Sequence, residues 1–213
     1  GIYYERPCLP SSAANIRVKL GLPADRHLYA SPQSLFKFHP DDDNALRRIL
    51  EADPLGLLIV IEGRVAEWTA RLKSRWQTTL GILADRIVFL PAMPHLDYLQ
   101  LLKACDVILD PLHFGGGNSS YEALAMGTPI VTMPSHFLRG RITAGLYRKM
   151  QMTDCIADSV EEYIDLAVKL ATNQEFRQEI SRKISEAVSV LFEDIHEVHS
   201  LEVALMECAA RRR

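Results

Sequence analysis

The sequence contains no apolar run that approaches the roughly 18 residues a membrane-spanning helix needs, and its N-terminus shows no signal-peptide pattern. It also contains no internal repeat and no low-complexity tract. The formal net charge is only −3, so nothing indicates a general affinity for nucleic acids or membranes. Its four cysteines are scattered and no pair has CxxC spacing, which argues against a zinc or redox motif and favours a reducing, cytoplasmic location.

Several catalytic motifs are missing as well. There is no GxSxG, no Gly-Lys-Ser/Thr after the glycines and no GxGxxG at a first strand, which argues against an ATPase and an ordinary dehydrogenase. His39, His136, His196 and His199 lack recognisable metal-ligand neighbours, and His113 has no obvious carboxylate partner. We therefore expect structural or surface roles for these histidines and no bound metal.

What the chain does contain is a regular alternation of strand and helix patterns. Strands are predicted at 27–31, 57–62, 86–90, 107–109, 129–133 and 155–157. Helices are predicted at 40–52, 65–80, 96–104, 119–126, 140–150, 159–172, 174–190 and 194–210. This alternation predicts an α/β fold: a Rossmann-like parallel sheet with helices on both faces.

Composition divides the chain into three parts. Residues 1–26 are rich in proline and include a Ser-Ser pair, which is typical of a linker or an edge segment. Residues 27–190 carry the strand–helix alternation and are expected to form the ligand-binding domain. Residues 191–213 are predicted to be a C-terminal helix and a basic tail.

The most informative stretch is 110–122, where an apolar strand ends in three glycines that lead into a helix. Backbone N–H groups and the positive end of a helix dipole favour an anion at such a junction. We expect Gly115, Gly116, Gly117, Asn118 and Ser119 to surround a phosphate group. Glu122 follows about one helical turn later, where its carboxylate can accept hydrogen bonds from sugar hydroxyls.

Two other segments follow strands and should reach the same edge of the sheet, because ligands bind at the carboxyl ends of parallel strands. In residues 31–37, Lys37 would place an ammonium against a diphosphate, with Gln33 and Ser34 in the same turn. Lys37 as an ordinary surface lysine, and the polar pair as turn caps, are the competing interpretations.

The second of these segments, residues 91–98, offers groups suited to a nucleobase. Tyr98 would stack on the base, the Met93 backbone would contact its edge, and His95 would donate or accept a hydrogen bond. The alternative is that Tyr98 is a core residue and His95 is merely exposed. Arg139 and Arg141 follow the strand predicted at 129–133, where a phosphate contact and a structural ion pair are equally compatible with the sequence.

Residues 31–40, 86–91, 106–111 and 114–134 together resemble the O-linked N-acetylglucosamine transferase family, including its SPINDLY-like and bacterial members. The resemblance runs from about residue 21 to 183. It implies the C-terminal half of a GT-B fold, the half that holds the UDP part of the sugar donor. The family's N-terminal half domain and tetratricopeptide repeats have no counterpart here, so we expect the chain to be part of a larger transferase.

The resemblance also implies roles for individual residues. Lys37 matches the catalytic lysine that contacts the donor diphosphate, and Glu122 matches the acidic residue that binds the ribose. Gly117, Asn118 and Ser119 match the phosphate loop and helix start, while Met93, His95 and Tyr98 match the uracil segment. Ser34 stands where animal members commonly have glutamine, and Gly117 and Tyr98 stand where they have histidine.

These observations predict the donor-binding domain of an inverting protein O-GlcNAc transferase that uses UDP-GlcNAc, without a cofactor or metal. Its partners would be the UDP-sugar and an acceptor protein that is bound through the missing N-terminal domain, and not nucleic acid or membrane. Two alternatives remain: a non-catalytic UDP or UDP-sugar binding module, and a related GT-B transferase that uses GDP-fucose or UDP-glucose.

Overall fold

The structure is a computed structural model that describes residues 2–9 and 15–211. Residues 1 and 10–14 of the predicted linker, together with Arg212 and Arg213 of the predicted basic tail, lie outside the described residues. Within the described part, no helix combines the length and the apolar character that crossing a bilayer requires.

A parallel sheet forms the centre of the fold, with its strands in the order β3-β2-β1-β4-β5 across the described residues. The strands are β1 (His27–Ala30), β2 (Gly56–Ile61), β3 (Ile87–Leu90), β4 (Val107–Leu109) and β5 (Ile130–Val131). Strands β1, β2 and β4 are largely or fully buried, as their continuous apolar sequences predict for a parallel sheet covered on both faces. The predicted α/β fold is confirmed.

Helices and short 3-10 turns precede, connect and follow these strands. The helices are α1 (Ile16–Lys19), α2 (Pro40–Ala52), α3 (Ala66–Leu80), α4 (His95–Ala104), α5 (Asn118–Ala125), α6 (Ile142–Lys149), α7 (Val160–Thr172), α8 (Gln174–Ala187) and α9 (Ile195–Ala210). The 3-10 turns are η1 (Leu35–Lys37), η2 (Gly81–Arg86), η3 (Leu138–Gly140) and η4 (Val188–Leu191).

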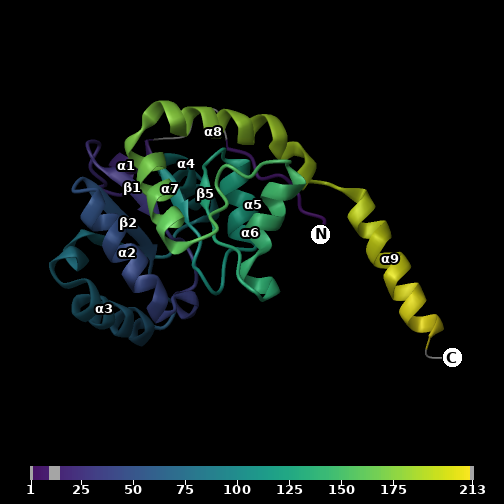
Figure 1. Cartoon of the computed structure of the whole chain (residues 1–213), viewed down its shortest axis with the longest axis horizontal. Coiled ribbons are helices and arrows are strands. Elements are labelled where there is room, and N and C mark those ends of the chain that lie inside the picture. The colour runs from purple at the N-terminus through teal and green to yellow at the C-terminus, as the bar shows by residue number, and fades with distance from the viewer. Residues whose placement is uncertain (1, 10–14, 212–213) are drawn as a thin grey trace.

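The helices form two groups around the sheet. Helix α2 packs against α3 and α7, and α7 also contacts β1, β4 and β5, whereas α4 packs against α1 and α5. Right-handed crossovers place helices on opposite faces when the chain reverses its direction across the sheet, as it does after β3. Helix α8 runs along the top of this body in Figure 1, and α9 projects away from it with none of its residues buried.

The acidic start of α2 illustrates how the sequence fixes a helix and its neighbours. His39 caps the helix, Asp42 accepts a hydrogen bond from the His39 N–H, and Pro40 occupies the first turn. Asp43 is buried and accepts a 2.8 Å hydrogen bond from the Trp76 indole, which joins α2 to α3. The acidic run therefore does more than complement the helix dipole: it also ties α2 to its surroundings.

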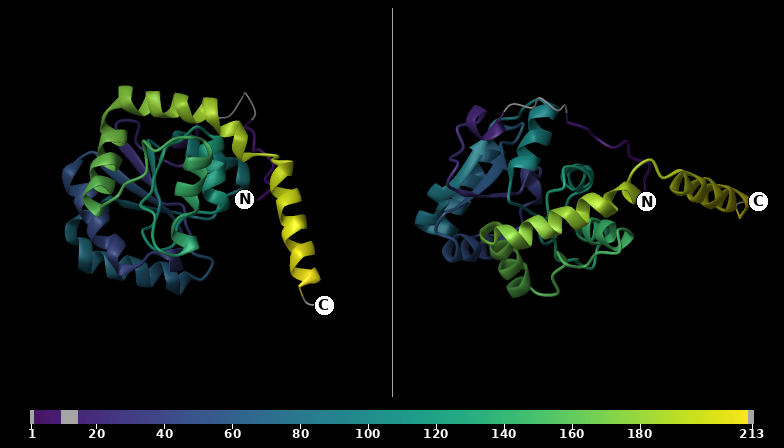
Figure 2. Two further views of the ribbon diagram at one scale, coloured as in Figure 1. Left: turned by 45° about the vertical axis from the view of Figure 1, so that its right-hand side comes forward. Right: turned by 90° about the horizontal axis from the view of Figure 1, so that it is seen from above.

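Two predicted segments differ from the structure. Residues 155–157 form only an isolated bridge, Thr132 to Ile156, instead of a strand, because a single pair of residues continues the sheet beyond β5. The expected linker, residues 1–26, contains α1, and Ile16 and Leu22 are part of the hydrophobic core. The first residues run back toward the start of α9, where the Glu193 N–H donates to the Tyr4 carbonyl (Figure 2).

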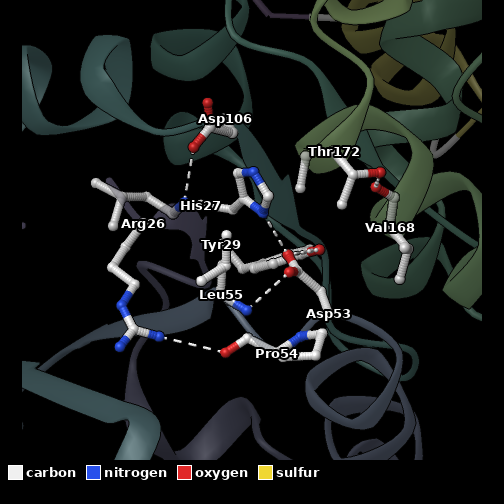
Figure 3. Close-up of polar contacts among 12 residues, drawn as sticks. Arg26, His27, Tyr29, Asp53, Pro54, Leu55, Asp106, Val168 and Thr172 are labelled. Atoms are coloured by element: carbon white, nitrogen blue, oxygen red, sulfur yellow. Dashed lines mark hydrogen bonds and ion pairs between the residues drawn. The ribbon is translucent and has the colours of Figure 1, made fainter. Parts of the chain in front are cut away.

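The amino ends of the strands are held by two carboxylates, Asp53 and Asp106 (Figure 3). Asp53 lies 2.8 Å from Nδ1 of His27 and accepts a 2.9 Å hydrogen bond from the Tyr29 hydroxyl. Asp106 accepts a 2.7 Å hydrogen bond from the Leu28 N–H. Because the polar groups at this edge satisfy each other and the backbone, a ligand site is expected at the opposite, carboxyl edge.

Candidate functional site

Strands β1 and β4 are neighbours in the sheet although two strands separate them in the sequence. From β1 the chain proceeds to β2 and β3, and it then returns to place β4 and β5 on the other side of β1. Crevices at such a reversal, outside the carboxyl ends of the strands, are where open α/β sheets bind ligands. The segment with Lys37 follows β1 and the glycine loop follows β4, so both predicted segments border this crevice.

Lys37 crosses the crevice and contacts the glycine loop. Its Nζ donates hydrogen bonds to the Gly115 carbonyl at 2.9 Å and to Oε1 of Gln33 at 2.8 Å, and it lies 4.7 Å from the centre of the Phe114 ring. Across the described residues, Lys37 forms no ion pair. Its charge is therefore held in place by neutral groups and remains available to an anion.

Burial lowers the pKa of the Lys37 amine below the usual lysine value, while the charge of Asp110 acts in the opposite direction. A bound anion would offset part of the free energy that it costs to keep a half-buried ammonium charged. Because no carboxylate already pairs with this ammonium in the described structure, an anionic ligand has no strong competitor for it.

Asp110, at the end of β4, organises the glycine loop from beneath. This buried carboxylate accepts a 2.6 Å hydrogen bond from the Gly116 N–H and a 2.8 Å hydrogen bond from the Thr132 hydroxyl. Burial raises the pKa of Asp110 above its usual range, and these hydrogen bonds oppose that rise. The Gly115 N–H donates to the Arg139 carbonyl, so Arg139 supports the loop through its backbone.

The close packing of the loop explains two of its three glycines. A Cβ on Gly115 would lie 2.6 Å from Oδ2 of Asp110, and one on Gly116 would lie 2.1 Å from Oγ of Ser120. Gly117 differs, since a Cβ there would meet nothing within 4 Å. Gly115 and Gly116 are thus required by close approach, whereas the position of Gly117 has room for a side chain.

Helix α5 begins directly after the loop, with Gly117 as its N-cap. In the described part of the chain no side chain caps this helix; instead, the Ser120 N–H donates to the Gly117 carbonyl. Gln33 donates a 2.7 Å hydrogen bond to the hydroxyl of Ser119, which links the β1 segment to the helix start. The open N–H groups of the first turn and the helix dipole make this helix start favourable for an anion.

A second group of predicted residues meets one turn further along α5. Nε2 of His95 lies 2.7 Å from Oε1 of Glu122, and the His95 ring stacks on Tyr98 with centroids 6.3 Å apart. Met93 is half-buried against the core. Tyr4, which the sequence did not single out, also approaches this group: burial and the neighbouring Glu122 carboxylate raise the pKa of its hydroxyl.

A cavity of about 570 Å³ lies beside Gln33 and Ser34, at the carboxyl ends of β1, β2 and β3. It is lined by Pro32, Gln33, Ser34, Leu35, Phe36, Ile61, Glu62, Gly63, Arg64, Trp68 and Ala92. Arg64 and Trp68 are exposed polar and aromatic groups that the sequence analysis missed. The available signal was their position just after a buried strand, which places them at the same edge as the other segments.

The histidines are arranged differently from the expectation. His113 has a carboxylate partner after all, because its Nε2 lies 2.8 Å from Oδ2 of Asp41. His39 lies beside the same carboxylate, and its ring centre is 4.4 Å from that of His113. His199 pairs with Glu202 on the exposed surface of α9, as a helix-surface role predicts.

Comparison with known proteins gives these observations a context. The model of the family described as Glycosyl transferase family 41 matches residues 10–201. A Caenorhabditis elegans UDP-N-acetylglucosamine–peptide N-acetylglucosaminyltransferase is 25% identical over 153 residues, which is 72% of this chain and 13% of that protein. The chain thus spans a small part of the relatives that it matches.

Solved structures agree on the fold. A Thermobaculum terrenum O-GlcNAc transferase mutant superposes with a TM-score of 0.74 and 27% identity, over 88% of this chain and 36% of that one. Anabaena Alr3699/HepE, solved in complex with UDP and glucose, superposes with a TM-score of 0.70 over 96% of this chain and 55% of that one. Its identity is 16%, so this second likeness concerns the fold alone.

Proposed function

Since the chain belongs to glycosyl transferase family 41, we propose that its crevice holds the UDP part of a UDP-N-acetylglucosamine donor. The chain would then be the donor-binding part of an inverting protein O-GlcNAc transferase that modifies serine or threonine hydroxyls. We expect the acceptor site and the general base to lie in parts of family members that this chain does not span.

One observation carries the proposal: Lys37 is a half-buried ammonium that neutral groups hold over a glycine loop and a helix start. A diphosphate fits this arrangement better than a neutral ligand, because it would accept hydrogen bonds from the ammonium and from the open N–H groups of the helix. Lys37 is the proposed catalytic residue in this site.

The remaining groups suit the other parts of the donor. Gly115, Gly116, Gly117, Asn118 and Ser119 would surround the phosphates, with Gln33 and Ser34 on the opposite side of the crevice. One helical turn away, Glu122, whose Oε1 contacts His95, would accept hydrogen bonds from the ribose hydroxyls. Met93, His95 and Tyr98 would hold the uracil, with the aromatic ring of Tyr98 as a flat partner.

The proposed chemistry is stabilisation of a leaving group. As the bond between the sugar and the diphosphate breaks, negative charge grows on the β-phosphate of UDP. The Lys37 ammonium, the N–H groups at the start of α5 and the dipole of that helix all stabilise this charge where it develops. These groups are fixed before the reaction, so little reorganisation accompanies it.

Nucleotide titration followed by thermal unfolding tests the proposal. UDP and UDP-N-acetylglucosamine should raise the unfolding temperature, since a ligand that binds only the folded state stabilises it. GDP should have a much weaker effect, because guanine presents a different hydrogen-bonding edge from uracil to residues 93–98. A clear shift with GDP and none with UDP would favour a guanine-nucleotide donor and would overturn the assignment of UDP.

Activity provides a separate readout. The chain alone should not transfer radiolabelled N-acetylglucosamine to protein, because its proposed role covers only the donor side. Robust transfer by the chain alone would contradict this division of labour, while a nucleotide-induced shift without transfer agrees with it.

A further inference from the structure

Two histidines and a carboxylate meet on the surface beside the entrance to the glycine loop. His39 precedes α2, Asp41 lies in its first turn, and His113 follows β4. Their candidate ligand atoms all lie within 4.8 Å of one another. Oδ2 of Asp41 is 2.8 Å from Nε2 of His113 and 3.3 Å from Nδ1 of His39.

The backbone around this cluster is held in place by a neighbouring side chain that is not part of it. Asp42 is buried, and one of its carboxylate oxygens accepts a 2.7 Å hydrogen bond from the His39 N–H. Its other oxygen accepts a 2.9 Å hydrogen bond from the N–H of Leu112, which is the residue before His113. One buried carboxylate therefore fixes both segments that carry the cluster, although about 70 residues separate them in the sequence.

We propose that His39, Asp41 and His113 form a three-ligand site for a divalent transition-metal ion of the zinc class. Imidazole nitrogens and carboxylate oxygens are ligands that zinc prefers, at about 2.0–2.2 Å. All three side chains are exposed, so small rotations bring the ligand atoms around an ion, and solvent can complete its coordination.

Two existing contacts compete with the metal: the one between Nε2 of His113 and Oδ2 of Asp41, which an ion would replace, and one at Nδ1 of His39. Nδ1 of His39 accepts a 3.2 Å hydrogen bond from the Asp41 N–H at the start of α2. This hydrogen bond is long and exposed, so water can replace it when the lone pair turns to a metal ion. The Asp41 carboxylate is exposed, and its two oxygens leave lone pairs for an ion.

The site is separate from the proposed donor crevice and does not depend on it. A bound ion would join the start of α2 to the chain that leads into the glycine loop, two residues before Gly115. We therefore expect metal binding to limit the motion of the residues that lead into this loop. The ion would have no role in the chemistry of the donor.

Isothermal titration of the whole chain with zinc chloride tests the site. Exposed thiols are themselves zinc ligands, so the parent for this experiment carries Cys8→Ser and Cys208→Ser. We expect one ion per chain, and at least about a tenfold weaker affinity in His113→Gln and Asp41→Asn. His39→Asn provides a third variant that keeps a good helix cap.

The matched control is His199→Gln. His199 is an exposed histidine 3.1 Å from the Glu202 carboxylate, but the described structure brings no third ligand to this pair. The His199→Gln variant should leave zinc affinity unchanged. Thermal unfolding in the absence of zinc checks that each variant is folded. Equal zinc affinity in the parent and in folded His113→Gln, no binding by the parent, or a loss only in His199→Gln would each overturn the proposal.

Discussion

Replacing Lys37 by alanine should weaken UDP binding by about 1.5–3 kcal/mol, roughly tenfold to a hundredfold, which is typical of a hydrogen bond to a charged group. The loss is expected because Lys37 forms no ion pair in the described structure and its Nζ already lies over the glycine loop. Isothermal titration with UDP gives the dissociation constants directly.

A general effect of charge needs to be separated from this specific one. Lys103 is an exposed lysine on α4, and Lys103→Ala removes the same charge at a different place. It should leave UDP affinity within a factor of about two, since exposed charges are strongly screened by salt. Equal losses in the two variants, or unchanged affinity in Lys37→Ala, would contradict the role given to Lys37.

Gly116→Ala and Gly117→Ala should behave differently although they add the same methyl group to adjacent residues. A Cβ on Gly116 would lie 2.1 Å from Oγ of Ser120, 2.9 Å from Oγ of Ser119 and 3.0 Å from Nε2 of Gln33. Ser120 cannot turn away without losing its 2.8 Å hydrogen bond with Thr143. We expect Gly116→Ala to cost about 1–3 kcal/mol of folding free energy, as overpacking does.

Gly116→Ala should also weaken UDP binding at least about tenfold. The added methyl group would displace the loop and the first turn of α5, so their N–H groups would no longer lie within hydrogen-bond distance of the phosphates. In Gly117→Ala the new Cβ meets nothing within 4 Å, and the backbone φ of −114° lies outside the left-handed region that favours glycine. Its cost should stay below about 1 kcal/mol, the usual effect of a less favourable N-cap. Urea unfolding and UDP titration measure both quantities, and similar losses in the two variants would refute the close-packing argument.

The sequence predicted the sheet and the glycine loop well because both are local patterns. The apolar run of β2 and the glycines followed by a helix at Asn118 need no knowledge of distant residues. The same reasoning placed Lys37 and Gly115 at one edge, and the structure joins them by a hydrogen bond. Whether these residues bind UDP stays a prediction.

Local sequence patterns do not predict contacts between segments that are far apart in the sequence. His113 and Asp41 are 72 residues apart, and their approach depends on β1 and β4 being neighbours and on the hydrogen bonds of Asp42. Tyr4 reaches the vicinity of Glu122 through a segment with no regular structure. Arg64 follows β2, and only its position after a buried strand indicated a place at this edge.

The short elements show a second limit. Residues 155–157 have the composition of a strand, yet they pair with the sheet through one bridge only. The length of a strand at a sheet edge depends on how many residues its partner strand can pair with, and β5 has only two residues. Similarly, α1 is a single turn whose Ile16 is buried against the core, and local propensity does not predict such a turn.

A crystal structure of the chain with UDP tests whether the crevice between Lys37 and the glycine loop holds the donor. We predict a diphosphate within hydrogen-bond distance of Lys37 Nζ and of the N–H groups of Asn118 and Ser119. The ribose should lie beside Glu122 and the uracil against residues 93–98. UDP bound only in the 570 Å³ cavity near Arg64 and Trp68, without contact to Lys37 or the start of α5, would contradict this prediction.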